Sequence, residues 1–336
     1  MRSLRCSAAP SISAAWIAES LGEASEPTLH TIISVISIER IRAATALARP
    51  HVMRTPLVPV EGALLKLECL QPTGSFKVRG FFAAALSLPQ ERLAKGLMTV
   101  SAGNAAQACA YAAKTLGVPC RVVMFDTAPA TKVAGVKRWG ATPIPMPREQ
   151  LFQWITSEGW KSEPESFIHP FADEDVMAGH GSLGLELVQE VPDLRRVVVP
   201  VGGGGLVSGV AAAVKGMRPE VEIIGVQSDG YPLWQKAFAE GGPVSIQAAT
   251  IADGTTAPYD ARMVGRLKES VDRWLIVPEP RLKAAIPQLA SAAKVVAEGA
   301  GALAYAALEQ LEPGPTTVAI VSGGNIDTAL LAELLN

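Results

Sequence analysis

The sequence predicts an α/β fold with two domains, in which parallel, twisted sheets are flanked by helices. From about residue 38 onward, short β-branched runs alternate with alanine-rich helical stretches, and glycines or small polar residues stand at several junctions. This alternation is typical of parallel sheets whose strands are connected by helices. A length of 336 residues with 49% hydrophobic residues allows a substantial core, divided over two domains.

The elements follow from the chain in order. Residues 38–48, IERIRAATALA, have a helical period, and LMTV at 97–100 predicts a buried strand. The loop SAGN then leads into a helix that Gly117 ends, and Ser75 is expected to cap an earlier helix. The strand RVVMF and the helix PATKVAGVKRWG repeat the unit. Further on come, in order, RRVVVPV, GGGG, LVSGVAAAVKG, EIIGVQ, TTVAIV and SGGN.

Composition excludes several classes of protein. Thirty basic and thirty-two acidic residues give a net charge of −2, so neither nucleic acid nor an anionic membrane is an expected partner. No apolar run approaches the length of a membrane span. The four cysteines have no C-x-x-C spacing and are too sparse for a disulfide framework. A reducing, cytoplasmic location is therefore expected. The four histidines lack metal-ligand spacing, so no metal is predicted.

Four consecutive glycines, Gly202, Gly203, Gly204 and Gly205, lie between a strand and a helix. Ligands of open parallel sheets bind beyond the carboxyl ends of the strands, and glycines let backbone N–H groups approach a phosphate. The dinucleotide pattern G-x-G-x-x-G fails here, because its third glycine falls on Val207 or Ser208. A nucleotide P-loop would need Gly-Lys-Ser/Thr, which is absent as well. A phosphate without a nucleotide is favoured, and a purely structural turn stays open.

Lys77 in QPTGSFKVRG raises a second question. A cation at the start of an apolar helix is disfavoured by the helix dipole. Either Lys77 is a solvated surface residue, or its charge is removed chemically. A positioned, desolvated lysine forms a Schiff base with a carbonyl cofactor, and pyridoxal 5′-phosphate carries one aldehyde and one phosphate. Together with the glycine loop, Lys77 therefore predicts that cofactor.

Six motifs in order carry a resemblance to a known family: LECLQPTGSFKVRG, SAGNAAQ, VPVGGGGLVSG, IADGTT, EGAGALAYAAL and SGGN. Over residues 38–336 the chain resembles the pyridoxal-phosphate enzymes of fold type II, the tryptophan synthase β fold. Within them it is similar to the threonine and serine dehydratases.

This resemblance implies roles for individual residues. Lys77 would be the catalytic Schiff-base lysine. The cofactor-binding residues would be Phe76, Lys77, Asn104, Gly202, Gly203, Gly204, Gly205, Leu206 and Ser322, with Asn104 at the phenolic oxygen and Ser322 at the pyridine nitrogen. The substrate would contact Ser101, Ala102, Gly103, Asn104, Gln107 and Asp253. Local alternatives stay open: Asn104 as a helix N-cap, Ser322 and Asp253 as turn residues, and Glu298 as a cap or a neighbour of the ring.

The implied reaction is β-elimination from a β-hydroxy L-amino acid, such as threonine or serine, to a 2-oxo acid and ammonia. Alternatives within the fold are a serine racemase or a dehydratase for a hydroxyaspartate, an aryl-serine or a hydroxyectoine-derived substrate. Alternatives outside it are an NAD-dependent oxidoreductase and a non-catalytic binder of the cofactor.

Three departures from the family pattern bear on these alternatives. Related racemases carry a second serine where this chain has Ala102, which argues against racemisation. Many relatives have histidine where this chain has Ala105, which leaves the substrate range open. Some relatives begin a structural cation site with a glutamate, and Gln227 stands there instead.

The expected domain organisation is a small mobile domain, residues 97–170, inserted into a large cofactor-binding domain of residues 38–96 and 171–336. The cofactor would lie between them, and the small domain would close on the substrate. The family is usually dimeric, so a homodimer is expected. Residues 1–37 are expected to be a poorly ordered extension, which is favoured over a targeting peptide.

Overall fold

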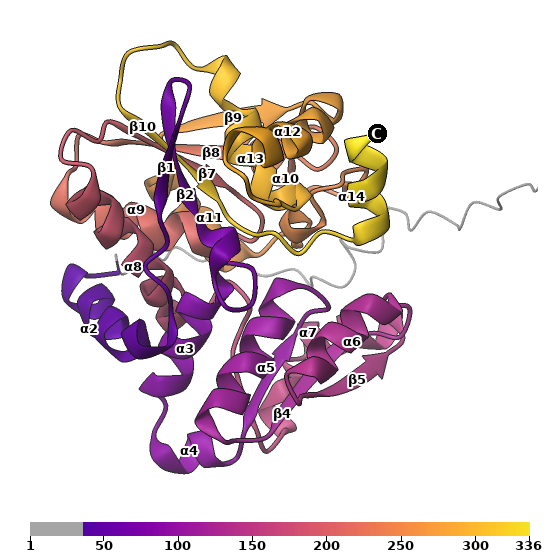
Figure 1. Ribbon diagram of the computed structural model, residues 1–336. Helices are drawn as coiled ribbons and strands as arrows, with labels where there is room; N and C mark the ends of the chain where they lie inside the picture. The colour runs from indigo at the N-terminus through magenta and orange to yellow at the C-terminus, as the bar shows by residue number, and fades with distance from the viewer. Residues whose placement is uncertain (1–35) are drawn as a thin grey trace, which may run out of the picture. The chain divides into compact units, whose positions relative to one another are not determined.

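The computed structural model describes residues 36–336, and the expected extension of residues 1–37 lies outside them except for its last two residues. Two sheets form the framework (Figure 1). The first has the strand order β1-β2-β10-β7-β8-β9: β1 Leu57–Val60, β2 Ala63–Leu67, β10 Thr317–Val321, β7 Arg196–Pro200, β8 Glu222–Ser228 and β9 Arg273–Val277. The second has the order β5-β4-β3-β6: β5 Thr142–Met146, β4 Cys120–Phe125, β3 Leu97–Val100 and β6 Ser166–Phe167.

All described strand pairs are parallel except one, as the sequence pattern predicts. β1 pairs with β2 in antiparallel register, because a short turn with Gly62 at φ +74° reverses the chain. Pro59 lies in β1 at the edge of the sheet, where a missing N–H breaks no interior ladder. The six-stranded sheet is therefore mixed at one edge and parallel elsewhere.

Helices connect the strands and cover the sheets. Their bounds are α2 Ile38–Ala48, α3 Lys77–Ser87, α4 Gln90–Ala94, α5 Asn104–Leu116, α6 Ala130–Arg138, α7 Arg148–Thr156, α8 Glu174–Glu190, α9 Gly205–Met217, α10 Leu233–Glu240, α11 Ala261–Ser270, α12 Glu279–Ala292, α13 Gly299–Ala306 and α14 Thr328–Leu335. Short 3₁₀ turns are η1 Arg49–His51, η2 Glu68–Leu70, η3 Gly159–Ser162, η4 Asp253–Thr255 and η5 Leu308–Gln310. The helix expected at residues 38–48 and the strand expected at 97–100 are both confirmed.

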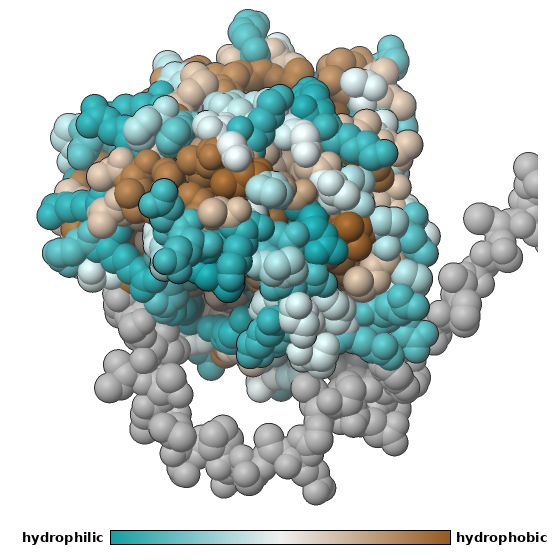
Figure 2. Space-filling view, turned by 90° about the horizontal axis from the view of Figure 1, so that it is seen from below, coloured by the Kyte–Doolittle hydropathy of each residue, from teal (hydrophilic) through white to brown (hydrophobic). Residues whose placement is uncertain are grey.

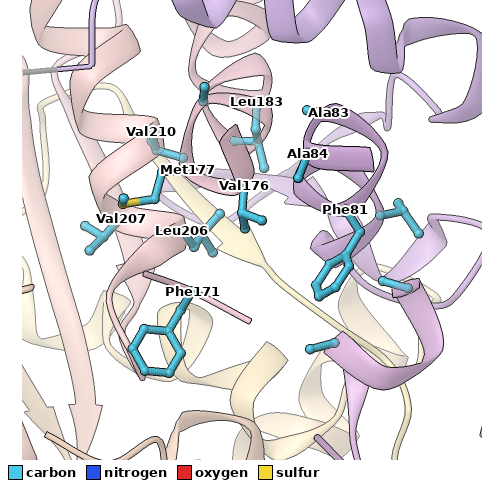
Figure 3. Close-up of a cluster of buried hydrophobic side chains, with 14 of the residues drawn as sticks. Phe81, Ala83, Ala84, Phe171, Val176, Met177, Leu183, Leu206, Val207 and Val210 are labelled. Atoms are coloured by element: carbon cyan, nitrogen blue, oxygen red, sulfur yellow. The ribbon is translucent and has the colours of Figure 1, made fainter. Parts of the chain in front are cut away.

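The six-stranded sheet is buried on both faces. In β7, Val197 and Val199 join one hydrophobic cluster, whereas Val198 between them joins the other. This follows from the two-residue period of a strand, and it explains the uninterrupted apolar run of the sequence. The first cluster contains side chains of α3, α8 and α9 (Figure 3), and the second contains side chains of α12 and α13.

The candidate site residues follow the carboxyl ends of neighbouring strands. The chain leaves β2 toward Lys77, leaves β7 into Gly202–Gly205, and leaves β10 into Ser322. Because β2, β10 and β7 are adjacent and parallel, these three loops share one edge of the sheet. In the four-stranded sheet, β3 likewise leads through Ser101 into α5.

Among residues 36–336, no helix is both long enough and apolar enough to cross a membrane. Seen from below, the molecule shows a hydrophobic patch bordered by hydrophilic residues (Figure 2).

Candidate active site

Lys77 begins α3 with its side chain turned into the protein. Its amine donates a hydrogen bond of 2.7 Å to the carbonyl oxygen of Pro170 and lies 5.0 Å from the centroid of the Phe76 ring. Burial lowers the pKa of this amine to about 8. An unusually large share of neutral amine is therefore present near neutral pH, as proton transfer or imine formation requires. This geometry does not fit a solvated surface lysine.

The start of α3 is held by a neighbouring loop. Ser75, which the sequence favours as a cap, makes no capping hydrogen bond, so that expectation is wrong. Instead, the Phe76 N–H donates to the Ser322 carbonyl over 3.1 Å, and the Gly324 N–H donates to the Gly74 carbonyl over 2.9 Å. Two loops that are far apart in the sequence are thus joined by their backbones, because β2 and β10 pair directly.

A buried charge network fixes α3 from the other side. Arg79 contacts Glu68 at 2.7 Å and Glu186 at 2.7 Å, and the Arg79 and Glu68 side chains are fully buried. Lys66, also fully buried, contacts Glu186 at 2.8 Å and Glu190 at 2.9 Å. Two cations and three carboxylates therefore lock α3, β2, η2 and α8 together around the turn that carries Lys77.

The four glycines form a tightly packed turn at the N-terminus of α9. Gly204 has φ +92°, a conformation that disfavours any side chain. A Cβ atom on Gly203 would lie 2.3 Å from the Phe171 ring, and one on Gly205 would lie 2.6 Å from the Phe171 carbonyl oxygen. The turn leaves the first N–H groups of α9 without partners inside the helix, a suitable place for a phosphate. Leu206, in the first turn of α9, is buried.

Lys77 and the glycine turn share a neighbouring segment. Pro170 accepts the hydrogen bond of the Lys77 amine, and Phe171 packs on Gly203 and Gly205. A desolvated amine and the N-terminus of α9 therefore lie beside the same two residues. The residues present fit a cofactor that carries one aldehyde and one phosphate.

Ser322 follows β10 and is 3% exposed. Its hydroxyl donates to the Ala300 carbonyl over 3.3 Å, which places it between β10 and α13. A hydroxyl here can offer a hydrogen bond to a ring nitrogen without adding a charge.

The SAGN loop and the first turn of α5 hold all of the predicted substrate residues except Asp253. The Ser101 hydroxyl accepts a hydrogen bond of 3.0 Å from the Gly103 N–H, and the Gln107 N–H donates to the Gly103 carbonyl. Ala102 is partly buried and packs against the main core. The N-terminus of α5 attracts a carboxylate, because its first N–H groups have no helical partner.

Asn104 connects the two sheets. Its amide nitrogen donates to the Glu298 carboxylate over 2.5 Å, and its amide oxygen accepts from the Asn325 side chain over 2.8 Å. The cap interpretation of Asn104 is wrong, because Gly103 holds the cap position and Asn104 is the first helical residue. Glu298 occupies the cap position of α13 but makes no capping hydrogen bond with its side chain.

Asp253 lies at the start of η4 and pairs with Lys132 of α6 at 2.6 Å. Both side chains are well exposed, at 57% and 38%. This ion pair is a second contact between the two sheets, beside that of Asn104 and Glu298.

Sequence reasoning missed several of these partners. Nothing in PATKVAGVKRWG singles out Lys132, and nothing marks Pro170 or Phe171, because their roles depend on distant segments. Asn325 stands in the quoted SGGN motif and could have been identified there. The buried Arg79 lies within QPTGSFKVRG, two residues after Lys77, and could have been identified there, because a buried charge in an apolar helix needs a partner.

No cluster of three or more potential metal-ligating side chains occurs among the described residues. Gln227 is fully buried, and its side-chain oxygen accepts from the Trp234 and Gln235 N–H groups at the start of α10. Gln227 therefore has a structural role, because it binds the first N–H groups of α10.

The fold and the arrangement of this site are typical of pyridoxal-phosphate enzymes. The family model described as "Pyridoxal-phosphate dependent enzyme" matches residues 48–323. The chain belongs to this family, and pyridoxal phosphate is its cofactor.

Two relatives are similar to the chain over most of their length. The chain is 38% identical to an L-threonine ammonia-lyase of Thermotoga maritima, over 90% of this chain and 79% of the relative. It is 36% identical to a catabolic L-threonine dehydratase of Staphylococcus aureus, over 92% and 94% of the two chains.

Solved structures agree with the fold. The T.th. threonine deaminase has a TM-score of 0.80 at 34% identity, with 87% of this chain and 99% of that chain covered. Maize serine racemase has a TM-score of 0.83 at 31% identity, with 89% and 96% covered.

Proposed function

We propose that the chain is a pyridoxal-phosphate-dependent ammonia-lyase that converts a β-hydroxy L-amino acid, threonine first, into a 2-oxo acid and ammonia. The observation that carries this proposal is the desolvated amine of Lys77 beside the segment that packs on the glycine turn. Two relatives whose names give L-threonine as their substrate support threonine as the substrate here.

The residues would hold the cofactor at three points. Gly202–Gly205, Leu206 and the N-terminus of α9 would take the phosphate, and Lys77 would take the aldehyde. Ser322 would face the ring nitrogen, with Phe76 and Asn104 beside the ring. When bound, pyridoxal phosphate withdraws electrons from Cα of the amino acid attached to it.

Residues of the chain would bind the substrate and transfer its proton. The N-terminus of α5, with Ser101, Ala102, Gly103 and Gln107, would orient the substrate through its carboxylate. The neutral amine of Lys77 would take the proton from Cα. The proton from Cα and the hydroxyl from Cβ would together make up the water that is lost, and addition of one water molecule to the resulting C=N bond would release ammonia and the 2-oxo acid. Asp253 would contact the substrate hydroxyl.

The test is a panel of β-hydroxy amino acids, with release of 2-oxo acid and ammonia as the measurement. Replacing Lys77→Ala should abolish release, whereas Lys95→Ala, at an exposed lysine of the same chain, should leave it unchanged. Borohydride reduction and peptide mapping should find the cofactor on Lys77. Activity in the Lys77→Ala protein, or a label on another lysine, would overturn the proposal.

The likeness to serine racemase favours one second candidate, racemisation of serine. A base on the other face of Cα would be needed, and Ala102 offers no hydroxyl there. Chiral chromatography of the serine reaction should therefore show no D-serine.

We also propose that residues 97–170 form the small mobile domain, that the chain forms a homodimer and that it works in the cytoplasm. A separate four-stranded sheet supports the first statement, and the hydrophobic patch of Figure 2 supports the second. Light scattering after size exclusion would give the mass in solution, and a monomer would contradict the dimer.

A further inference from the structure

Glu298 is a buried carboxyl group at the boundary between the two sheets. It is 5% exposed, and Oε1 accepts the hydrogen bond of 2.5 Å from Asn104, which lies 194 positions earlier in the sequence. Its backbone is fixed as well, because the Glu298 N–H donates to the Gly323 carbonyl over 3.1 Å.

The amide of Asn104 is held at both ends. Its nitrogen donates to Glu298, and its oxygen accepts from Asn325, whose own nitrogen also donates to the Thr73 carbonyl over 2.7 Å. This leaves Asn104 in one orientation, with the second N–H of its amide nitrogen still available. Without the Glu298 carboxyl, the Asn104 amide nitrogen would lose its acceptor, and only the bond from Asn325 would distinguish the nitrogen from the oxygen.

The surrounding backbone leaves room for this carboxyl group. A Cβ atom on Gly323 would lie 2.2 Å from Glu298 Oε1 and 3.2 Å from the Asn104 amide nitrogen. Any side chain at position 323 would therefore displace the contact. Gly323 is the first glycine of the SGGN motif. The Glu298 carboxyl group requires a glycine there as much as the loop itself does.

We propose that Glu298 is a positioning residue, whose carboxyl group fixes the Asn104 amide at the active site and whose protonation adjusts that hold. The proposal rests on the proposed function for its kinetic consequences, but not for its structural ones. Asn104 is the group that would meet the cofactor, and Glu298 acts through it.

The charges around Glu298 favour a proton at unusually high pH. Burial, and then the charge of Asp253, raise the pKa of the Glu298 carboxyl to about 7, while Asn104, Lys132 and the Asn325 N–H act in the opposite direction. Cys69 also faces it, with a thiol whose pKa burial and Glu68 raise to about 12, so that it stays neutral. Loss of the proton between about pH 6 and 8 strengthens the acceptor for Asn104.

The sign of the stability effect follows from linkage. The pKa of Glu298 in the folded chain lies above its ordinary value of 4.5, so its proton stabilises the fold fully below that value. This contribution is lost as the pH rises through about 7.

The first experiment needs no catalysis. Infrared difference spectra of the full chain without cofactor, titrated from pH 5 to pH 9, should show a protonated carboxyl band that disappears near pH 7 and is missing from the Glu298→Gln protein. Lys132→Met should move the midpoint to higher pH, because it removes the cation that stabilises the carboxylate. Lys215→Met, which breaks the ion pair with Asp272, should leave the midpoint in place.

The second experiment is the pH profile of kcat/KM for the cofactor-loaded enzyme. Glu298→Ala should lower kcat/KM roughly tenfold or more, the size expected when a hydrogen bond to a charged group is lost. Glu298→Gln keeps an oxygen acceptor without a titrating proton, so it should keep most activity and lose the acidic limb near pH 7. Glu298→Asp keeps a titrating group that is too short to reach Asn104, so it should lose activity while keeping an infrared titration.

The outcomes separate this proposal from the proposed function. Absence of the Glu298 band in the infrared titration, or wild-type kcat/KM in the Glu298→Ala protein, would overturn the positioning role. Either result would leave the Lys77 experiment untouched. If Lys77→Ala kept its activity while the infrared titration behaved as expected, the proposed function would fail and the carboxyl contact with Asn104 would stand.

Discussion

At the scale of the residue, the decisive feature is how the environment changes an ordinary side chain. Lys77 and Glu298 carry the same groups as any lysine or glutamate, yet burial lowers the pKa of the first to about 8 and raises that of the second to about 7. Both shifts favour the neutral form, and buried groups with such shifts are frequent at functional sites. The sequence predicted a neutral Lys77 from its motif. For Glu298 it left two roles open, a helix cap and a neighbour of the cofactor ring.

Lys77→Met should stabilise the chain without cofactor near pH 7. The pKa of Lys77 in the folded chain lies below its ordinary 10.5, so its ammonium opposes folding at pH 7 and this cost disappears as the pH rises past 10.5. A shift of this size corresponds to about 1 to 3 kcal/mol in the free energy of unfolding.

Urea denaturation at pH 7 and at pH 10 measures this difference, which should shrink at the higher pH. Lys95→Met, at an exposed position, serves as the control and should have no effect at either pH. A Lys77→Met protein less stable than the wild type at pH 7 would show that the hydrogen bond to Pro170 outweighs the burial cost.

At the scale of the element, α3 is positioned by charges rather than by a cap. Ser75 makes no capping hydrogen bond, and the helix is held by Arg79 against Glu68 and Glu186 in addition to the backbone bond from Phe76 to Ser322. Sequence patterning located this helix correctly but could not identify what fixes it. The partners lie 11 and 107 positions away, and no local period marks them.

Arg79→Met should destabilise the chain by about 3 to 5 kcal/mol, because it leaves buried carboxylates without a counter-charge. The double replacement Arg79→Met with Glu68→Gln should recover part of this loss. Urea denaturation measures both, with Arg42→Met, at an exposed position of α2, as the control. Equal losses in the single and double variants would mean that the ion pair itself contributes little.

At the scale of the whole molecule, the described chain holds two sheets whose elements meet through one shared hydrophobic cluster and through polar contacts. Asn104 and Glu298 form one of them, and Lys132 and Asp253 form another. The second pair is exposed, so it contributes at most about 1 kcal/mol and weakens with salt. Contacts of this kind are compatible with a small domain that opens and closes.

Hydrogen exchange should report this closure. L-Alanine has no hydroxyl to lose, so it can occupy the site of the cofactor-loaded enzyme without elimination. We expect slower exchange in α5 and α6 with alanine than without it, and little change in α12, which lies on the far face of the large sheet. Equal rates in α5 and α6 under both conditions would contradict a mobile domain of residues 97–170.

The sequence by itself determined the alternation of strands and helices, the cofactor family and the positions of Lys77, the glycine turn and Ser322. These features depend on local periods and on motifs of adjacent residues, which a linear reading detects. Only the tertiary structure decided that Pro170 accepts from Lys77, that Glu298 holds Asn104 and that Lys132 meets Asp253. The physical reason is that the partners in each pair are 93 or more positions apart, and only the pairing and packing of the sheets bring them together.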